Sequence, residues 1–368
     1  MRRGTSVSLL AAIASLPALA VLGAALAGAA NSPSDGAQAL IQAGHWKRAR
    51  AILEPQLKAH PQDPQGAYLL AQVDMAFRDF DGALPLAQRA VELDGKNSNY
   101  HLKLGQIYGE MAARASMFAA GSLAVKFRKE VEIALDLDPK NLEALDSMMQ
   151  FKFQAPGLMG GDKNRARALT GEITRLSLSE GYLAQAELAE LEKNPAEMEA
   201  NYLKAVEADP KNYHALTTLA RFYSSPPRQN LDAATKYAQQ AWQLDPSRAD
   251  AGWILARVFV LQERWSDLQA ILVASEKNVP DDLCPFYEAA HALLEIGKEF
   301  PRAEGYAKKY LSQEPEGEEP DTADAHRLLG LVFEREGQIS EGRTEIETAL
   351  QLRPNFKAAK EDLKRMGK

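Results

Sequence analysis

The chain of 368 residues carries a formal net charge of −7, and 25% of its residues are charged. Aromatic residues make up 7% and alanine is frequent, which is typical of packed helices and argues against disorder or a β-sandwich. The negative charge and the lack of Lys/Arg runs argue against nucleic acid as a partner.

Residues 1–30 differ from the rest of the chain. A pair of arginines precedes an apolar run from Leu9 to Leu26, which ends in the small residues Ala27-Gly28-Ala29. This order is typical of a cleaved secretory signal peptide, which predicts a periplasmic or secreted protein without a stable membrane span after cleavage. The alternative is anchoring by an uncleaved N-terminal helix, since about 20 apolar residues can span a bilayer. Pro17 and the many alanines weaken such a span, so we expect cleavage.

Two short amphipathic stretches recur over residues 31–368 with a period of about 34 residues. In the last copy Leu329 and Phe333 belong to an apolar stripe, Gly330 pairs with Gly342 where two helices approach, and Pro354 ends the second helix. The copies end near nine positions, roughly 32 to 44 residues apart: Pro61, Gly95, Pro139, Leu178, Pro210, Pro246, Pro280, Pro315 and Pro354.

These motifs resemble the tetratricopeptide repeat family, and the resemblance covers nearly all of the chain after residue 30. It implies an all-α fold, a right-handed α-solenoid of about nine helix-turn-helix pairs whose faces are buried only by stacking. Copies four and five depart from the pattern, with Leu178 where proline is usual and Met198 where alanine is usual. Residues 355–368 predict a polar C-terminal capping helix from Lys357 to Met366. The N-terminal pattern further indicates an exported bacterial member.

The third copy is about ten residues longer than the others, between Gly109 and Val125. Helical composition on both sides of Gly121-Ser122 predicts two extended helices joined at a Gly-Ser turn, with an apolar-tipped hairpin over residues 111–123. The two helices could simply cover each other. Alternatively, the hairpin is a partner-binding knob that presents Met117, Phe118 and Leu123.

The fourth copy contains a glycine-rich loop with Gly157, Gly160 and Gly161. A phosphate-binding loop needs a preceding strand and Lys-Ser or Lys-Thr, whereas here a helical segment precedes the loop and Lys163 is followed by asparagine. We expect a helix stop, with Asp162 capping the next helix. A backbone nest for an anion remains the alternative, and the loop is a candidate partner contact because loops often carry recognition.

No pattern in the chain predicts catalytic or metal chemistry. The six histidines are scattered and Cys284 is the only cysteine, so we expect no metal, no cofactor and no internal disulfide. Ser224–Pro227 predicts a turn rather than a nucleophile elbow. The acidic run Glu314–Asp321 lacks the ligand order of a calcium loop, so we expect it to be a solvated, flexible loop between repeats. We therefore expect that the protein is not an enzyme.

Helical geometry predicts a ligand groove in the C-terminal half. If the small residue of each first helix faces its partner helix, three further positions lie roughly 60 to 120° around that helix. In this family that face lines the concave surface. The positions are His214, Thr217, Arg221, Asp250, Trp253, Arg257, Cys284, Tyr287, His291, Asp324, Arg327 and Leu331. Their arginines and rings favour an extended acidic peptide or its terminal carboxylate, unless the arginines only pair with neighbouring aspartates.

The corresponding positions of copies two and three are neutral, which assigns any charge selectivity to the C-terminal half. These features predict a non-catalytic protein-protein or peptide-binding scaffold of the cell envelope. The alternative is an accessory subunit in envelope-polymer or lipid handling, which contacts a membrane or a complex through the 111–123 hairpin. The predicted partner is a protein or extended peptide with acidic chemistry.

Overall fold

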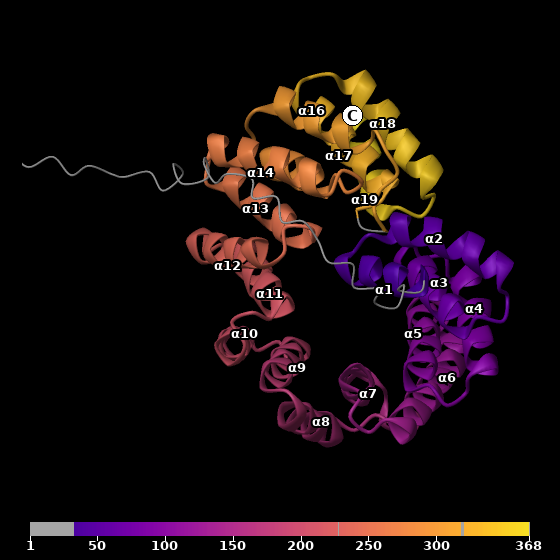
Figure 1. Cartoon of the computed structure of the whole chain (residues 1–368). Coiled ribbons are helices and arrows are strands. Elements are labelled where there is room, and N and C mark those ends of the chain that lie inside the picture. Colours follow the sequence, from indigo (N-terminus) through magenta and orange to yellow (C-terminus); the bar gives the residue numbers. More distant parts are fainter. Residues whose placement is uncertain (1–32, 227, 318–319, 368) are drawn as a thin grey trace, which may run out of the picture. The chain divides into compact units, whose positions relative to one another are not determined.

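The computed structural model describes residues 33–226, 228–317 and 320–367, which contain helices α1 to α19 and no strand (Figure 1). The predicted signal peptide lies outside the described residues, as do the side chains of Met117 and Phe118. Residues 33–368 form one compact unit. Within the described residues, no helix combines the length and the apolar character needed to cross a bilayer.

The helices follow one another as antiparallel pairs along a curved array (Figure 1). The pairs are α1 (Pro33–Ala43) and α2 (Trp46–Ala59), α3 (Pro64–Ala76) and α4 (Phe80–Leu93), α5 (Ser98–Arg114) and α6 (Met117–Leu137), α7 (Leu142–Gln154) and α8 (Lys163–Leu176), α9 (Leu178–Leu191) and α10 (Pro195–Ala208), α11 (Tyr213–Ser224) and α12 (Leu231–Leu244), α13 (Ala249–Leu261) and α14 (Trp265–Asn278), α15 (Cys284–Ile296) and α16 (Phe300–Tyr310), α17 (Thr322–Arg335) and α18 (Ile339–Leu352). The last helix, α19 (Lys357–Met366), packs on α18.

Small residues set the close contacts within the pairs. In the last pair, a Cβ on Gly330 would lie 2.8 Å from the backbone oxygen of Gly342, so only glycine permits this approach. Ala71 and Ala83 are fully buried in the second pair. Most first helices also contact the first helix of the next pair, and the apolar faces form a series of buried clusters along the stack. The predicted all-α solenoid is confirmed.

A single residue, Ser177, links the last helix of copy four, α8, to the first helix of copy five, α9, and no proline separates them. Ser177 ends α8 and also begins α9, where its hydroxyl accepts the N–H of Glu180. A Cβ on Gly181 would lie 2.3 Å from the Cα of Thr174, so glycine lets the two helices meet directly. This close crossing explains why the closing motif is absent at Leu178.

The long third copy turns at a different place from the predicted one. The connection between α5 and α6 is Ala115–Ser116, whereas Gly121 and Ser122 lie inside α6. The predicted Gly-Ser turn is therefore wrong, because one glycine costs an alanine-rich helix only about 1 kcal/mol. Ser116 has extended backbone angles and supplies the break instead. Leu123 packs in the cluster around Leu104.

The glycine-rich loop is a short 3-10 turn, η1 (Gly157–Met159), between α7 and α8. The amides of residues 159 to 162 all donate to carbonyl oxygens within residues 152–157, so they are not free to form an anion nest. Asp162 Oδ1 accepts the N–H groups of Asn164 and Arg165, which confirms its predicted role as a helix cap.

Candidate ligand groove

A groove of about 760 Å³ runs along the first helices α11, α13 and α15 and the start of α17. The solenoid places these helices side by side, so equivalent positions of successive copies share one surface. Six of the predicted positions line it: Arg221, Asp250, Trp253, Arg257, Tyr287 and Asp324. We call this hollow the arginine groove.

The arginine groove contains four arginines and three carboxyls, namely Arg78, Arg221, Arg257, Arg353, Asp250, Glu288 and Asp324. Arg221 is the most open of the predicted arginines, with 60% of its side chain exposed and Asp250 only at 3.9 Å. Arg257 is more constrained, since it donates to Glu295 at 2.6 Å. Burial raises the pKa of Glu288 although Arg257 and Arg221 oppose the shift, and this weakens its negative charge. Arg353 is in turn paired with Asp324 at 2.7 Å, so the groove holds arginines and carboxyls in nearly equal number.

Aromatic side chains give the arginine groove an apolar floor. The indole N–H of Trp253 is buried and has no hydrogen-bond partner among the described residues. Tyr287 stacks on His291, with ring centroids 6.2 Å apart and planes 13° apart. Burial also raises the pKa of Tyr287, so its hydroxyl stays protonated near neutral pH. An arginine beside such rings can bind a carboxylate while the rings bury the adjoining chain.

The remaining predicted positions lie elsewhere. Thr217 and Cys284 are buried, so the prediction that they face the concave surface is wrong. Their side chains point into the helix contacts: the Thr217 hydroxyl donates to the Tyr213 backbone, and the Cys284 thiol meets the Tyr310 hydroxyl at 3.9 Å. His291 is exposed beside Arg257, at 3.3 Å, without lining the groove.

Arg327 and Leu331 are taken up by the C-terminal helix. Arg327 donates to Asp362 of α19 at 2.6 Å, and Leu331 packs in the cluster that includes Ala359 and Met366. The prediction treated α17 as a concave surface like that of the earlier copies. The capping helix instead covers this part of α17.

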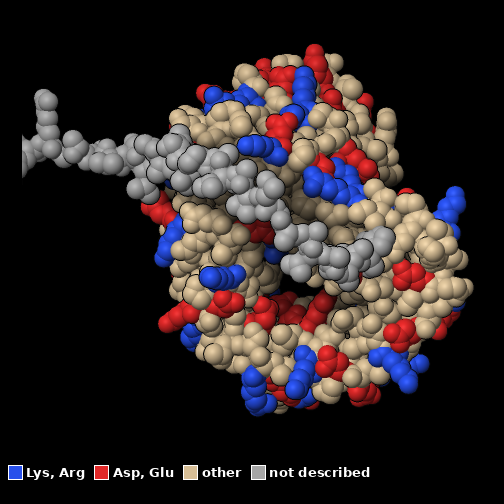
Figure 2. Space-filling model, in the orientation of Figure 1, with Lys and Arg blue, Asp and Glu red and all other residues tan. Residues whose placement is uncertain are grey.

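His214 lies in a second hollow, of about 600 Å³, lined by α7, α9 and α11. Its carboxyls are Glu143, Asp146, Glu180, Glu187 and Glu190, and we call it the acidic hollow. Burial and the charge of Asp146 raise the pKa of Glu187 to about 8, so these two carboxyls share a proton at neutral pH. Figure 2 shows acidic side chains along the lower rim of the central hollow of this face.

Sequence reasoning missed the acidic hollow and two arginines of the groove. Glu143 and Asp146 are three residues apart on α7, a spacing that places side chains on one helix face and could have revealed the hollow. Arg78 lies in the α3–α4 turn with φ of 54°, and Arg353 follows the last residue of α18. Neither lies on a first helix, so repeat geometry did not select them.

The two candidate partner loops lie together. Arg128 of α6 donates to the backbone oxygen of Met159 at 3.1 Å, and Lys152 donates to that of Gly160 at 3.0 Å. A third hollow, of about 650 Å³, is lined by Ala112 of α5, Ala124 of α6 and Pro156 and Met159 beside the glycine-rich loop. The pair α5 and α6 therefore contacts the glycine-rich loop.

The model of the tetratricopeptide repeat matches residues 34–99 and 287–355, which are the first two pairs and much of the last two. No curated protein matches the sequence significantly. Similar solved structures include a thermophilic TPR protein of Thermus thermophilus, with 21% identity over 52% of this chain and 98% of that one and a TM-score of 0.46. A tetratricopeptide repeat protein of Parabacteroides merdae has 16% identity over 72% and 99%, with a TM-score of 0.47. Yeast Tom70 has 13% identity over 91% and 87%, with a TM-score of 0.48.

The stacked helix pairs and the arginine groove define a helical-repeat protein with a surface suited to binding other proteins. Two segments, one at each end of the stack, are thus similar to the tetratricopeptide repeat family.

Proposed function

We propose that this protein is a non-catalytic scaffold of the cell envelope that binds an extended acidic segment of a partner protein in the arginine groove. The observation that carries the proposal is the position of Arg221, Arg257 and Trp253 in one hollow on successive first helices. Guanidinium groups bind carboxylates in a bidentate fashion, and the ring of Trp253 adds apolar area beside them.

The acidic hollow limits where along the stack of helices an acidic segment can bind. Its carboxyls line the neighbouring first helices α7 and α9, so a negatively charged segment is repelled beyond α11. The segment is therefore confined to copies six to nine. A partner that continues past α11 carries neutral or basic residues there.

An array of extended peptides with graded charge tests the binding proposal. Each peptide is probed with the chain from residue 31 onward at low salt, because exposed charges are screened at high salt. We expect the amount of chain bound to each peptide to rise with the number of Glu and Asp residues and to fall with added salt. A ranking that follows apolar content alone, or favours basic peptides, overturns the proposal.

The proposed envelope location depends on residues 1–30, and it has its own test. The signal-peptide pattern predicts that the protein purified from its native cells starts at residue 30 or 31. N-terminal sequencing reads this start directly. A chain that retains Met1 and sediments with membranes supports the uncleaved anchor instead.

A further inference from the structure

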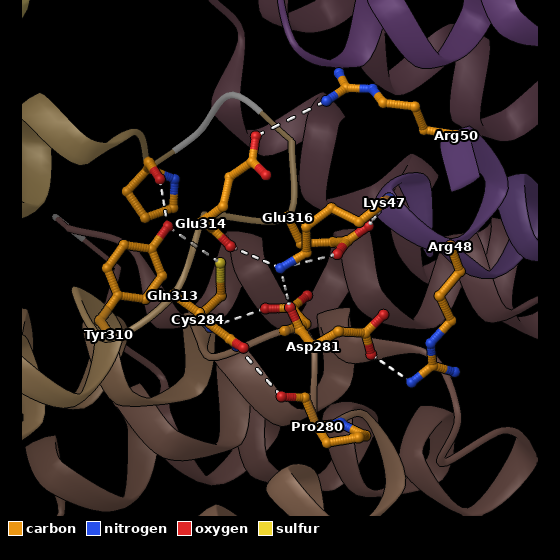
Figure 3. Close-up of polar contacts among 12 residues, drawn as sticks. Lys47, Arg48, Arg50, Pro280, Asp281, Cys284, Tyr310, Gln313, Glu314 and Glu316 are labelled. Carbon is orange, nitrogen blue, oxygen red and sulfur yellow. Dashed lines mark hydrogen bonds and ion pairs between the residues drawn. The ribbon is translucent and has the colours of Figure 1, made fainter. Parts of the chain in front are cut away.

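The first turn of α2 lies against two loops from the other end of the array, α14–α15 (residues 279–283) and α16–α17 (residues 311–317) (Figure 3). Lys47 Nζ donates to the backbone oxygens of Asp281 and Glu314, both at 2.6 Å. Arg48 pairs with Asp281, and Arg50 lies 3.8 Å from Glu314. We call these contacts, together with those of Glu316, the clasp.

Glu316 provides the helix cap that α2 lacks. His45, the residue before α2, makes no side-chain capping hydrogen bond. Glu316 Oε1 instead accepts the backbone N–H of Lys47 at 2.7 Å, from 269 residues further along the chain. A carboxylate there satisfies an open amide and interacts favourably with the helix dipole. With 1% of its side chain exposed and Lys47 Nζ at 3.5 Å, this is a buried and specific contact.

The clasp also completes the walls around the arginine groove. Arg78, from the α3–α4 turn, lines the groove together with residues of α11 to α17. Trp46 of α2 and Trp253 of α13 line the same two smaller hollows, of about 400 and 200 Å³, and Glu316 lines both. The first two helix pairs therefore supply the wall opposite α13.

We infer that the clasp closes the array around a segment bound in the arginine groove, so that closure and binding stabilise each other. A ligand that touches both walls binds the closed array more tightly than an open one, and by linkage it favours closure. The ligand in this inference rests on the proposed function, whereas closure by the clasp does not.

Distances between spin labels test closure without any ligand. Spin labels are attached at Ala51→Cys in α2 and Val273→Cys in α14, two exposed sites on opposite sides of the clasp. The native Cys284 is only 1% exposed, so it is protected from labelling. Lys47→Glu with Arg48→Glu should lengthen and broaden the distance distribution. Lys58→Glu with Lys96→Glu, exposed lysines with the same total charge change, should leave it unchanged. Glu316→Gln serves as the milder variant if the double reversal fails to fold.

A fluorescein-labelled acidic peptide tests the coupling between closure and binding. Its sequence is taken from the peptides that bind best in the charge-graded peptide array. We expect the clasp variants to weaken binding about tenfold and the lysine controls to leave it unchanged. Saturating peptide should also narrow the distance distribution of the unaltered chain.

The outcomes separate the two proposals. An unchanged distance distribution in the clasp variants overturns closure by the clasp. A longer distance with unchanged peptide affinity overturns the coupling and leaves the proposed function intact. If the unaltered chain binds no acidic peptide, the proposed function fails, and the coupling fails with it even if the clasp still sets the distance.

Discussion

Gly161 shows how a residue with functional appearance can be fixed by packing. A Cβ at this position would lie 1.8 Å from the backbone oxygen of Ala155, whereas a Cβ on Gly157 meets nothing within 4 Å. Gly161→Ala must therefore move the loop, and we expect it to lower the free energy of unfolding by about 2 kcal/mol. Urea denaturation followed by circular dichroism measures the change. Gly157→Ala in the same loop is the control and should stay within about 0.5 kcal/mol.

The shared proton of the acidic hollow predicts a pH-dependent stability. Because the pKa of Glu187 is raised to about 8, well above its usual value of about 4.3, its deprotonation opposes folding. The contribution of protonated Glu187 to the free energy of unfolding is fully present at low pH and is lost as the pH rises from about 5 to 8. Glu187→Gln, which keeps the uncharged shape, should remove this decline and stabilise the fold by about 1–2 kcal/mol at pH 8.5.

Thermal denaturation between pH 5 and 8.5 measures this effect. Glu207→Gln is the control, because Glu207 is exposed on α10 and lies outside the acidic hollow. If both variants follow the pH profile of the unaltered chain, the two carboxyls do not share a proton.

The location of a single side chain was predictable where its position around the helix alone decides whether it lines the groove. Arg221, Trp253 and Arg257 were placed in the groove because their spacing from the small residues fixes their direction. Thr217 and Cys284 satisfied the same spacing, yet both side chains are buried in helix contacts. The exact rotation of each helix depends on the size of its neighbours, which one periodic rule does not include.

At the scale of elements, α19 stabilises the end of the array. Its Ala359 and Met366 pack against Ile346 of α18, and Asp362 accepts hydrogen bonds from Arg327 and Arg365. Truncation after Pro354 should expose this apolar face, lower the melting temperature and cause self-association. Light scattering and thermal denaturation measure both effects.

The matched control for the truncation changes only the polar face of α19. Lys357→Gln with Lys360→Gln alters exposed residues, so it should preserve the melting temperature and the monomer mass. A truncated chain that melts like the full chain and remains monodisperse would show that α19 is dispensable.

Elements ended by proline, and α8 with its Asp162 cap, were the most predictable. These residues remove a backbone donor or satisfy the first amides, so their effect is local. The α5–α6 turn was misplaced because helix propensity in Ala-rich sequence changes little along residues 111–123. Packing of Leu123 and neighbouring residues against α5 then decided where the chain turns.

At the scale of the whole molecule, local periodicity predicted the solenoid but not the contact between distant repeats. The acidic run that includes Glu314 and Glu316 was expected to be a solvated loop. Its Glu316 is instead buried against Lys47. The curvature that brings these residues together accumulates from small rotations in many pairs, and no short motif encodes it.

The central claim is that the arginine groove binds acidic segments. The most direct test is the fluorescence anisotropy of a labelled acidic peptide chosen from the peptide array. Arg221→Glu with Arg257→Glu should reduce its affinity at least about 100-fold, because two attractive charges become repulsive. Arg175→Glu with Arg335→Glu, exposed residues outside the groove, should preserve the affinity of the unaltered chain. Equal affinity of the groove variant and the unaltered chain would contradict the account.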